Sequence, residues 1–171
     1  MIDKTKQIVE KLNLLPHPEG GYYKEVYRSD EQIKSESLPN RFGGNRNFCT
    51  SIYFLLEGED KSHFHKIKSD EIWHFYSGTT IILHLIDSEG IHKCVKVGNN
   101  IEKDEMPQGV VPYGVWFAAE VEDKTSFALV GCTVSPGFDF NDFELAEREN
   151  LLRMFPNHSE VIRRFTKQET T

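Results

Sequence analysis

The order of apolar and polar side chains divides the chain into a β-rich middle and helical ends. Between residues 50 and 134, short apolar runs alternate with clusters of glycine, asparagine, aspartate and serine. Side chains alternate between the two faces of a strand, so short runs without intervening helices predict a sandwich or a barrel. The predicted strands cover residues 22–28, 50–56, 62–66, 71–76, 80–87, 91–97, 115–121 and 127–134.

Apolar residues at helical spacing predict helices near the ends of the chain. The first covers residues 4–15 and ends at the prolines that follow, where His17 is expected in a solvated loop. The second is expected from about residue 141 to 155, and a short helix follows Pro156. Residues 29–47 are polar and interrupted by glycines, so we expect a long surface loop there.

The composition fits one domain covering residues 1–171, with 12 phenylalanines to fill its interior. The net charge of −7 argues against nucleic acid as a partner, because phosphate binding requires a basic surface. No apolar run is long enough to span a membrane, and residues 1–15 lack the apolar segment of a signal peptide. These features predict a cytoplasmic protein.

Three cysteines, Cys49, Cys94 and Cys132, are too widely spaced to form a zinc or redox motif with one another. We expect buried free thiols, as is usual in a reducing cytoplasm. No motif places a histidine or a basic residue beside any of them, so we do not expect a cysteine nucleophile.

The stretch with the most chemically suggestive residues is 58–78, GEDKSHFHKIKSDEIWHFYSG. On an extended chain His63 and His65 point to the same face, and Asp70 or Glu71 on the next strand brings a carboxylate near them. Two histidines with a carboxylate form a common metal site, and a histidine oriented by an acid is a common general base. Both interpretations fit these residues.

Alternation also predicts which side chains line a cavity, because residues two apart on a strand share a face. If Glu71 points inward, Trp73 and Phe75 point inward as well. A carboxylate set among tyrosines, such as Glu25, suits a polar cavity or the edge of a sheet. The predicted ligand-binding residues are Glu25, Trp73, Phe75, Gln108 and Trp116.

Five blocks of the chain carry a resemblance: LPHPEGGYYKEVYRS, TSIYFLL, SHFHKIKSDEIWHFYSG, PQGVVPYGVWFAAE and GCTVSPGFDFNDFELA. In this order they resemble a family of small single-domain cupins related to the dTDP-sugar epimerases. The resemblance implies an all-β fold, the double-stranded β-helix or cupin jelly-roll barrel, with short N- and C-terminal helices. It also implies a small-molecule cavity inside the barrel and a homodimer.

The resemblance raises the question of a metal, which the general cupin signature allows us to examine. The glycines and the glutamate of its first motif fit, but His63 and His65 each stand one position early, a displacement that a β-bulge can absorb. Phe117 stands where the second motif has its fourth ligand. The candidate ligands for a divalent metal are therefore His63, His65 and one carboxylate, Glu71 or Asp70. The sequence requires no cofactor, and we expect the isolated protein to be substantially metal-free.

Three hypotheses about function follow. The resemblance favours an isomerase or epimerase of a sugar or sugar-nucleotide-like carbonyl compound, with His65 or His63 as the base and Glu71 or Asp70 orienting it. The candidates for the acid are Tyr53, Tyr76 and Tyr113. The second hypothesis is a barrel that binds a small ligand without turnover. The third is a metal-dependent enzyme that uses His63, His65 and Glu71 as ligands.

Overall fold

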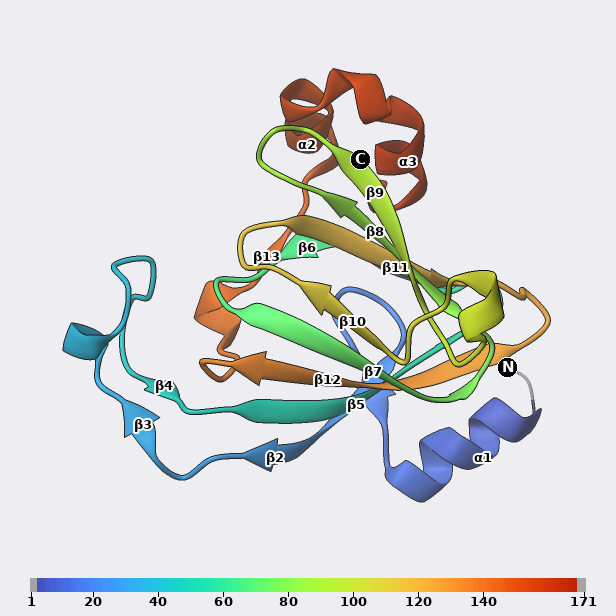
Figure 1. Cartoon of the computed structure of the whole chain (residues 1–171), viewed down its shortest axis with the longest axis horizontal. Coiled ribbons are helices and arrows are strands. Elements are labelled where there is room, and N and C mark those ends of the chain that lie inside the picture. Colours follow the sequence, from blue (N-terminus) through green and yellow to red (C-terminus); the bar gives the residue numbers. More distant parts are fainter. Residues whose placement is uncertain (1–2, 169–171) are drawn as a thin grey trace.

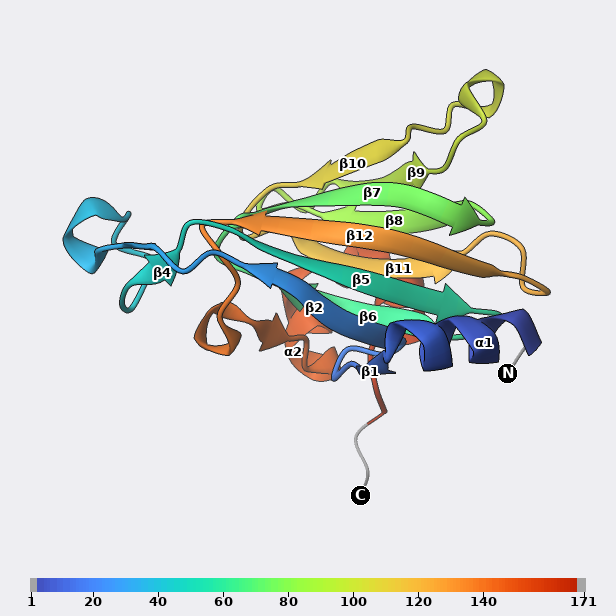
Figure 2. The same cartoon turned by 90° about the horizontal axis from the view of Figure 1, so that it is seen from below.

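Two antiparallel β-sheets face each other in the computed structural model, which describes residues 3–168 (Figures 1 and 2). The six-stranded sheet has the order β1-β2-β5-β12-β7-β10, and the five-stranded sheet has the order β13-β6-β11-β8-β9. Every pair of neighbouring strands in these sheets is antiparallel. This arrangement confirms the predicted jelly-roll barrel with short terminal helices.

The strands of the two sheets enclose the barrel, and a small separate hairpin, β3–β4, projects from one end of it (Figure 1). The strands of the larger sheet are β1 (Leu15–Pro16), β2 (Tyr22–Arg28), β5 (Thr50–Glu57), β7 (Asp70–Gly78), β10 (Gln108–Val111) and β12 (Phe127–Ser135). The strands of the smaller sheet are β6 (Lys61–Lys66), β8 (Ile81–Ile86), β9 (His92–Val97), β11 (Trp116–Val121) and β13 (Glu144–Leu145). The hairpin consists of β3 (Gln32–Ile33) and β4 (Arg46–Asn47).

The helical segments lie near the two ends of the chain and in the loops. The α-helices are α1 (Asp3–Leu12), α2 (Arg148–Met154) and α3 (Ser159–Arg164), and the short 3₁₀ turns are η1 (Ser35–Ser37), η2 (Ile101–Lys103), η3 (Phe140–Asp142) and η4 (Pro156–His158). No helix among residues 3–168 combines the length and the apolar character that crossing a membrane requires.

The main hydrophobic core fills the barrel between the inner faces of the two sheets. Alternation along each strand places these side chains inward, and burying a large apolar side chain stabilises the fold by about 1.5–3 kcal/mol. The buried members include Phe54, Leu56, Trp73, Ile81, Leu83, Leu85, Val97, Phe117, Val121 and Val130. Phe54 and Trp73 of this core also line a cavity between the sheets.

The helices cover the outer faces of the sheets. Helices α2 and α3 pack on the smaller sheet, where Phe64, Ile86 and Trp116 meet Leu151 and Phe165 in a second core (Figure 1). Helix α1 and the residues that follow it pack on the larger sheet, in a third core formed by Leu14, Leu55 and Phe127 (Figure 2).

Both terminal helices are shorter than predicted, because strand pairing competes with them. The first helix ends at Leu12, since Asn13 adopts a left-handed conformation and Leu15–Pro16 then pairs with β2. At the other end, the prediction of a helix from residue 141 is wrong. Glu144–Leu145 pairs with the edge of β6 instead, and the helix begins at Arg148.

Candidate functional site

A cavity of about 300 Å³ lies between the sheets, and its lining includes Arg28 at the end of β2 and Thr50 at the start of β5, the two residues that flank the segment of the hairpin β3–β4. Its wall is mainly aromatic and aliphatic, as is usual for small-molecule sites. The lining residues are His17, Glu19, Tyr23, Glu25, Arg28, Thr50, Ile52, Phe54, His65, Ile67, Glu71, Trp73, Cys132, Val134, Phe138, Phe140 and Phe143. Any acid–base chemistry in this cavity therefore depends on the few titratable side chains in its wall.

A buried carboxyl group, Glu19, connects the polar side chains at one part of the wall. Its Oε2 lies 3.1 Å from Nε2 of His65 and 3.3 Å from Nδ1 of His17. Its Oε1 accepts a hydrogen bond of 2.8 Å from the hydroxyl of Ser62. Glu19 is 5% exposed, so nearly all its polar contacts are with protein groups rather than water.

The protons of this cluster can be assigned from its hydrogen bonds. Nδ1 of His65 donates to the carbonyl oxygen of His63 at 2.8 Å, because a carbonyl oxygen can only accept. Burial lowers the pKa of His65 to about 3, so the ring is neutral and its Nε2 carries no proton. Burial and the nearby charge of Glu71 raise the pKa of Glu19 well above its usual value. We therefore assign one proton to the pair, on Glu19 and donated to Nε2 of His65.

The prediction that His17 is solvated is wrong. Its side chain is 8% exposed, and the backbone N–H of Glu19 donates to its Nδ1 at 3.3 Å. The ring stands edge-on to Tyr23, with 4.5 Å between the ring centroids. Burial lowers the pKa of His17 to about 4, so this ring is also neutral at neutral pH.

Glu71 is the carboxyl group that β7 directs into the cavity. Its neighbour Asp70 is exposed and accepts a hydrogen bond of 2.8 Å from the backbone N–H of Tyr113. Burial raises the pKa of Glu71 from 4.5 to about 7, although a hydrogen bond with Cys132 acts in the opposite direction. Glu71 can therefore accept or donate a proton near neutral pH, as a general base or acid requires.

A bulge in β6 separates the two histidines that the sequence placed on one face. Ser62 pairs with Ala119 of β11, and His65 pairs with Phe117. The chain advances three residues along β6 between these pairs but only two along β11, so β6 contains one extra residue. Ser62 and His65 consequently both reach Glu19. His63 is not among the lining residues, and its Nδ1 donates instead to the backbone carbonyl of Glu19 at 2.6 Å.

The predicted ligand-binding residues divide into two groups. Glu25 and Trp73 line the cavity, and Glu25 forms a bidentate pair with Arg28 there. Phe75 packs farther along the main core. Gln108 is exposed and its amide lies 3.2 Å from Nδ1 of His74.

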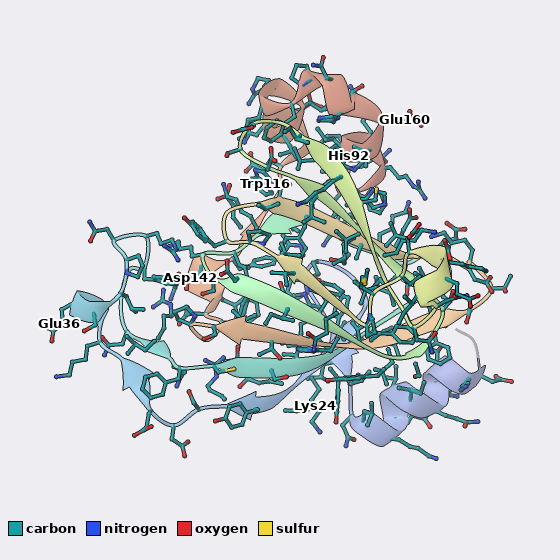
Figure 3. The ribbon with its side chains drawn as sticks, viewed as in Figure 1. Lys24, Glu36, His92, Trp116, Asp142 and Glu160 are labelled. Carbon is teal, nitrogen blue, oxygen red and sulfur yellow. The ribbon has the colours of Figure 1, made fainter. Side chains whose placement is uncertain are left out.

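Trp116 lies outside the barrel interior, on the face of β11 that the C-terminal helices cover (Figure 3). Lys66 sits over its ring at 4.4 Å from the centroid. The cavity therefore brings His65, Glu71, Glu25 and Trp73 together, and a role in ligand binding for the remaining residues stays a prediction.

The residues inside the barrel do not fit a bound metal. Both ring nitrogens of His65 already have partners, Glu19 and the carbonyl of His63, and His63 itself points elsewhere. Phe117 packs against His65 with 4.0 Å between ring centroids, so no fourth ligand is available on that side. Among residues 3–168, the donor atoms that gather as metal ligands are those of His84, His92 and Cys94, outside the cavity.

The sequence alone did not identify Glu19. It stands in the loop between β1 and β2 and reaches β6 because Gly20 and Gly21 make a tight turn with φ of 117° and 71°. A Cβ on Gly20 would lie 2.0 Å from the carbonyl oxygen of Lys61, so only glycine fits there. A carboxylate directly before two glycines was the signal available in the sequence.

Comparisons with known proteins agree with the fold. The profile of the family described as Cupin superfamily (DUF985) matches residues 6–146. The uncharacterised protein YML079W of Saccharomyces cerevisiae is 33% identical over 157 residues, which cover 86% of this chain and 78% of that protein.

Solved structures show the same architecture. The protein SO0799 from Shewanella oneidensis has a TM-score of 0.87 at 36% identity, over 96% of this chain and 98% of that one. A hypothetical protein from Leishmania major has a TM-score of 0.86 at 35% identity, over 95% and 98%. Oxalate decarboxylase from Bacillus subtilis shares the fold alone, with a TM-score of 0.55 at 17% identity, over 90% of this chain and 37% of that one.

Proposed function

The chain belongs to the DUF985 family of the cupin superfamily, and from its cavity we propose that it is an isomerase or epimerase of a small carbonyl compound, a sugar or a sugar-nucleotide-like molecule. The observation that carries this proposal is Glu71, a buried carboxyl group in an aromatic cavity whose pKa lies at about 7. Buried acids with such a pKa are typical of sites that transfer protons.

The proposed reaction begins when ionised Glu71 removes a proton from the carbon next to the substrate carbonyl. The electron pair of the C–H bond moves to the carbonyl oxygen and forms an enolate. Near pH 7 a large fraction of Glu71 is ionised, because its pKa is about 7. The surrounding apolar wall keeps water from competing for the proton.

The proton that Glu19 donates to His65 in the free protein supports this step as an acid when Glu19 donates it to the bound substrate instead. The pair is uncharged and sits in the same cavity as Glu71, so it can stabilise the enolate oxygen or return a proton to carbon. Two acid groups with different pKa values in one site are the arrangement that acid–base catalysis needs. Proton return to the other face or to the neighbouring carbon gives epimerisation or isomerisation.

The sequence favoured a histidine as the base, with Asp70 or Glu71 as its orienting group, whereas the proposal makes Glu71 the base. Burial lowers the pKa of His65 to about 3, so its ring is a weak base. Its orienting acid is Glu19 at 3.1 Å.

The size of the cavity limits the ligand. About 300 Å³ is near the lower end of the range for small-molecule sites, roughly 300–1,000 Å³. One sugar ring or a compound of similar size fits this space, and the nucleotide part of a sugar nucleotide would extend past the opening. Phe138, Phe140 and Phe143 offer aromatic faces to such a ring.

The proposal is tested by a thermal-shift screen of sugar nucleotides and small carbonyl compounds, followed by turnover assays of every compound that binds. We expect the Glu71→Gln variant to bind the same compounds and to lose at least a hundredfold in turnover, because glutamine keeps the shape and cannot accept a proton. The Glu122→Gln variant, which alters an exposed carboxylate paired with Lys96, is the matched control and retains activity.

The second candidate function is binding without turnover, which the predominantly apolar wall favours. It predicts compounds that raise the melting temperature and show no reaction in wild type or in Glu71→Gln. Unchanged turnover in Glu71→Gln would instead contradict the proposed role of this residue.

A further inference from the structure

Outside the barrel cavity, we propose a zinc site formed by His84, His92 and Cys94 on the face of the smaller sheet that the C-terminal helices border. His84 and Cys94 are direct cross-strand partners on β8 and β9, and His92 stands two residues before Cys94. Residues two apart share a face of the strand, so the three side chains converge. Figure 3 shows His92 near the C-terminal helices.

The separations of the donor atoms match those around a tetrahedral zinc ion. With Zn–N bonds of about 2.05 Å and a Zn–S bond of about 2.3 Å, tetrahedral angles require about 3.3 Å between two nitrogens and about 3.6 Å between nitrogen and sulfur. Nδ1 of His84 lies 3.4 Å from Nε2 of His92 and 3.4 Å from Sγ of Cys94. Sγ of Cys94 lies 4.0 Å from Nε2 of His92, which a small rotation of either side chain would shorten.

A carboxylate holds His84 in the orientation that a metal ligand needs. Nε2 of His84 donates to Oε1 of Glu120 at 3.2 Å, which leaves the Nδ1 lone pair facing Cys94 and His92. Lys124 and Arg164 bind the other oxygen of Glu120 and fix the carboxylate in turn. Metal-binding histidines commonly donate their second nitrogen to such a carboxylate.

The set of donors selects the metal class. Two imidazoles and a thiolate suit a borderline-soft divalent ion such as Zn²⁺, and three protein ligands leave a fourth position for water. The thiol of Cys94 releases its proton to solvent as the Zn–S bond forms. Cys94 is exposed, so zinc can reach the site from solution.

This placement corrects the expectation that the cysteines are buried thiols, because Cys132 is buried but Cys49 is only half-buried. Cys94 is exposed rather than buried, and it has two histidines beside it although no motif in the sequence indicated them. The contact arises because β8 and β9 pair in a register that sets His84 against Cys94.

The test is a titration of the full chain, freed of metal with a chelator, with Co²⁺ as a spectroscopic probe and then with Zn²⁺. We expect one Co²⁺ per chain, an intense thiolate-to-cobalt absorption band in the near ultraviolet, and displacement of Co²⁺ by one equivalent of Zn²⁺. The variants Cys94→Ser and His92→Ala change accessible side chains, and circular dichroism checks their folding. Each is expected to weaken binding at least tenfold, and Cys94→Ser loses the sulfur band.

Two control variants separate this site from other sources of binding. Cys49→Ser removes the thiol directly before β5, outside the proposed site, and this variant is expected to bind metal like wild type. His65→Ala alters the barrel cavity and is also expected to bind like wild type. Absence of saturable binding in the wild type, an unchanged sulfur band in Cys94→Ser, or loss of binding only in His65→Ala would each overturn the proposal.

Discussion

Replacing Glu71 with glutamine is expected to stabilise the protein at alkaline pH and to change its stability little in acid. Glu71 is buried, and burial disfavours its charged form, so its pKa rises from 4.5 to about 7 in the folded chain. The folded state therefore holds this proton to a higher pH than the unfolded state does. The protonated form of Glu71 makes its full contribution to the free energy of unfolding below about pH 4.5. This contribution is lost as the pH rises through about 7.

The size of the effect follows from the two pKa values. A pKa that rises from 4.5 to about 7 corresponds to about 3 kcal/mol, at about 1.4 kcal/mol for each factor of ten. Glutamine has the shape of the protonated acid and stays neutral at every pH. The variant should therefore exceed wild type in free energy of unfolding by less than about 1 kcal/mol at pH 5 and by about 3 kcal/mol at pH 8.

The assay is urea unfolding of wild type and Glu71→Gln at pH 5, 6, 7 and 8, followed by tryptophan fluorescence. Comparing the two proteins at each pH cancels the titration of the groups that do not interact with Glu71; Glu19 is not among these groups, because the charge of Glu71 raises its pKa. For Glu122→Gln, which changes an exposed carboxylate, the difference from wild type in free energy of unfolding should not increase with pH. A difference between wild type and Glu71→Gln that stays constant from pH 5 to pH 8, or a variant less stable at pH 8, would refute the assignment of a raised pKa to Glu71.

The remaining predictions concern the packing around the cavity and the assembly. Asp142→Asn breaks the buried pair with Arg46 at 2.5 Å and should lower the free energy of unfolding by about 3 kcal/mol in urea titrations; a loss below about 1 kcal/mol would contradict this. Phe165→Ala, in the core beneath the C-terminal helices, should cost about 3–5 kcal/mol in the same assay, and a smaller loss would show that this core contributes little. We also expect a homodimer, because the outer face of the larger sheet leaves Tyr27 and Tyr76 exposed by 54% and 50%; light scattering that shows a monomer at micromolar concentration would exclude it.

The strands could be predicted from the sequence because their pattern is local. Each predicted strand is present within a few residues of its expected bounds, for example residues 22–28 as β2 and residues 115–121 as β11 (Trp116–Val121). The short strands β1, β3, β4, β10 and β13 were missed, and β3 and β4 lie in residues 29–47, where a surface loop was expected. Two to four residues carry too little alternation to predict, and their extended form depends on the neighbouring strand with which each one pairs.

Only part of the candidate site could be predicted, because the rest depends on contacts between distant segments. Alternation along β7 predicted that Trp73 shares a face with Glu71 but did not decide whether Asp70 or Glu71 points inward; Glu71 and Trp73 both line the cavity. The bulge in β6 separated His63 from His65, and a bulge of one residue leaves no mark in the alternation of so short a strand. Glu19 was missed because its loop meets β6 only in the folded chain.

The most direct test of the proposed proton transfer is exchange with deuterated solvent. Compounds that bind in the thermal-shift screen are incubated with the protein in D₂O, and proton NMR follows the hydrogen on the carbon next to the carbonyl. We predict that wild type replaces this hydrogen with deuterium near pH 7 and that Glu71→Gln does so at least a hundredfold more slowly. A compound that binds in the cavity and exchanges no hydrogen with wild type, or exchanges equally fast with Glu71→Gln, would contradict the assignment of Glu71 as the group that moves the proton.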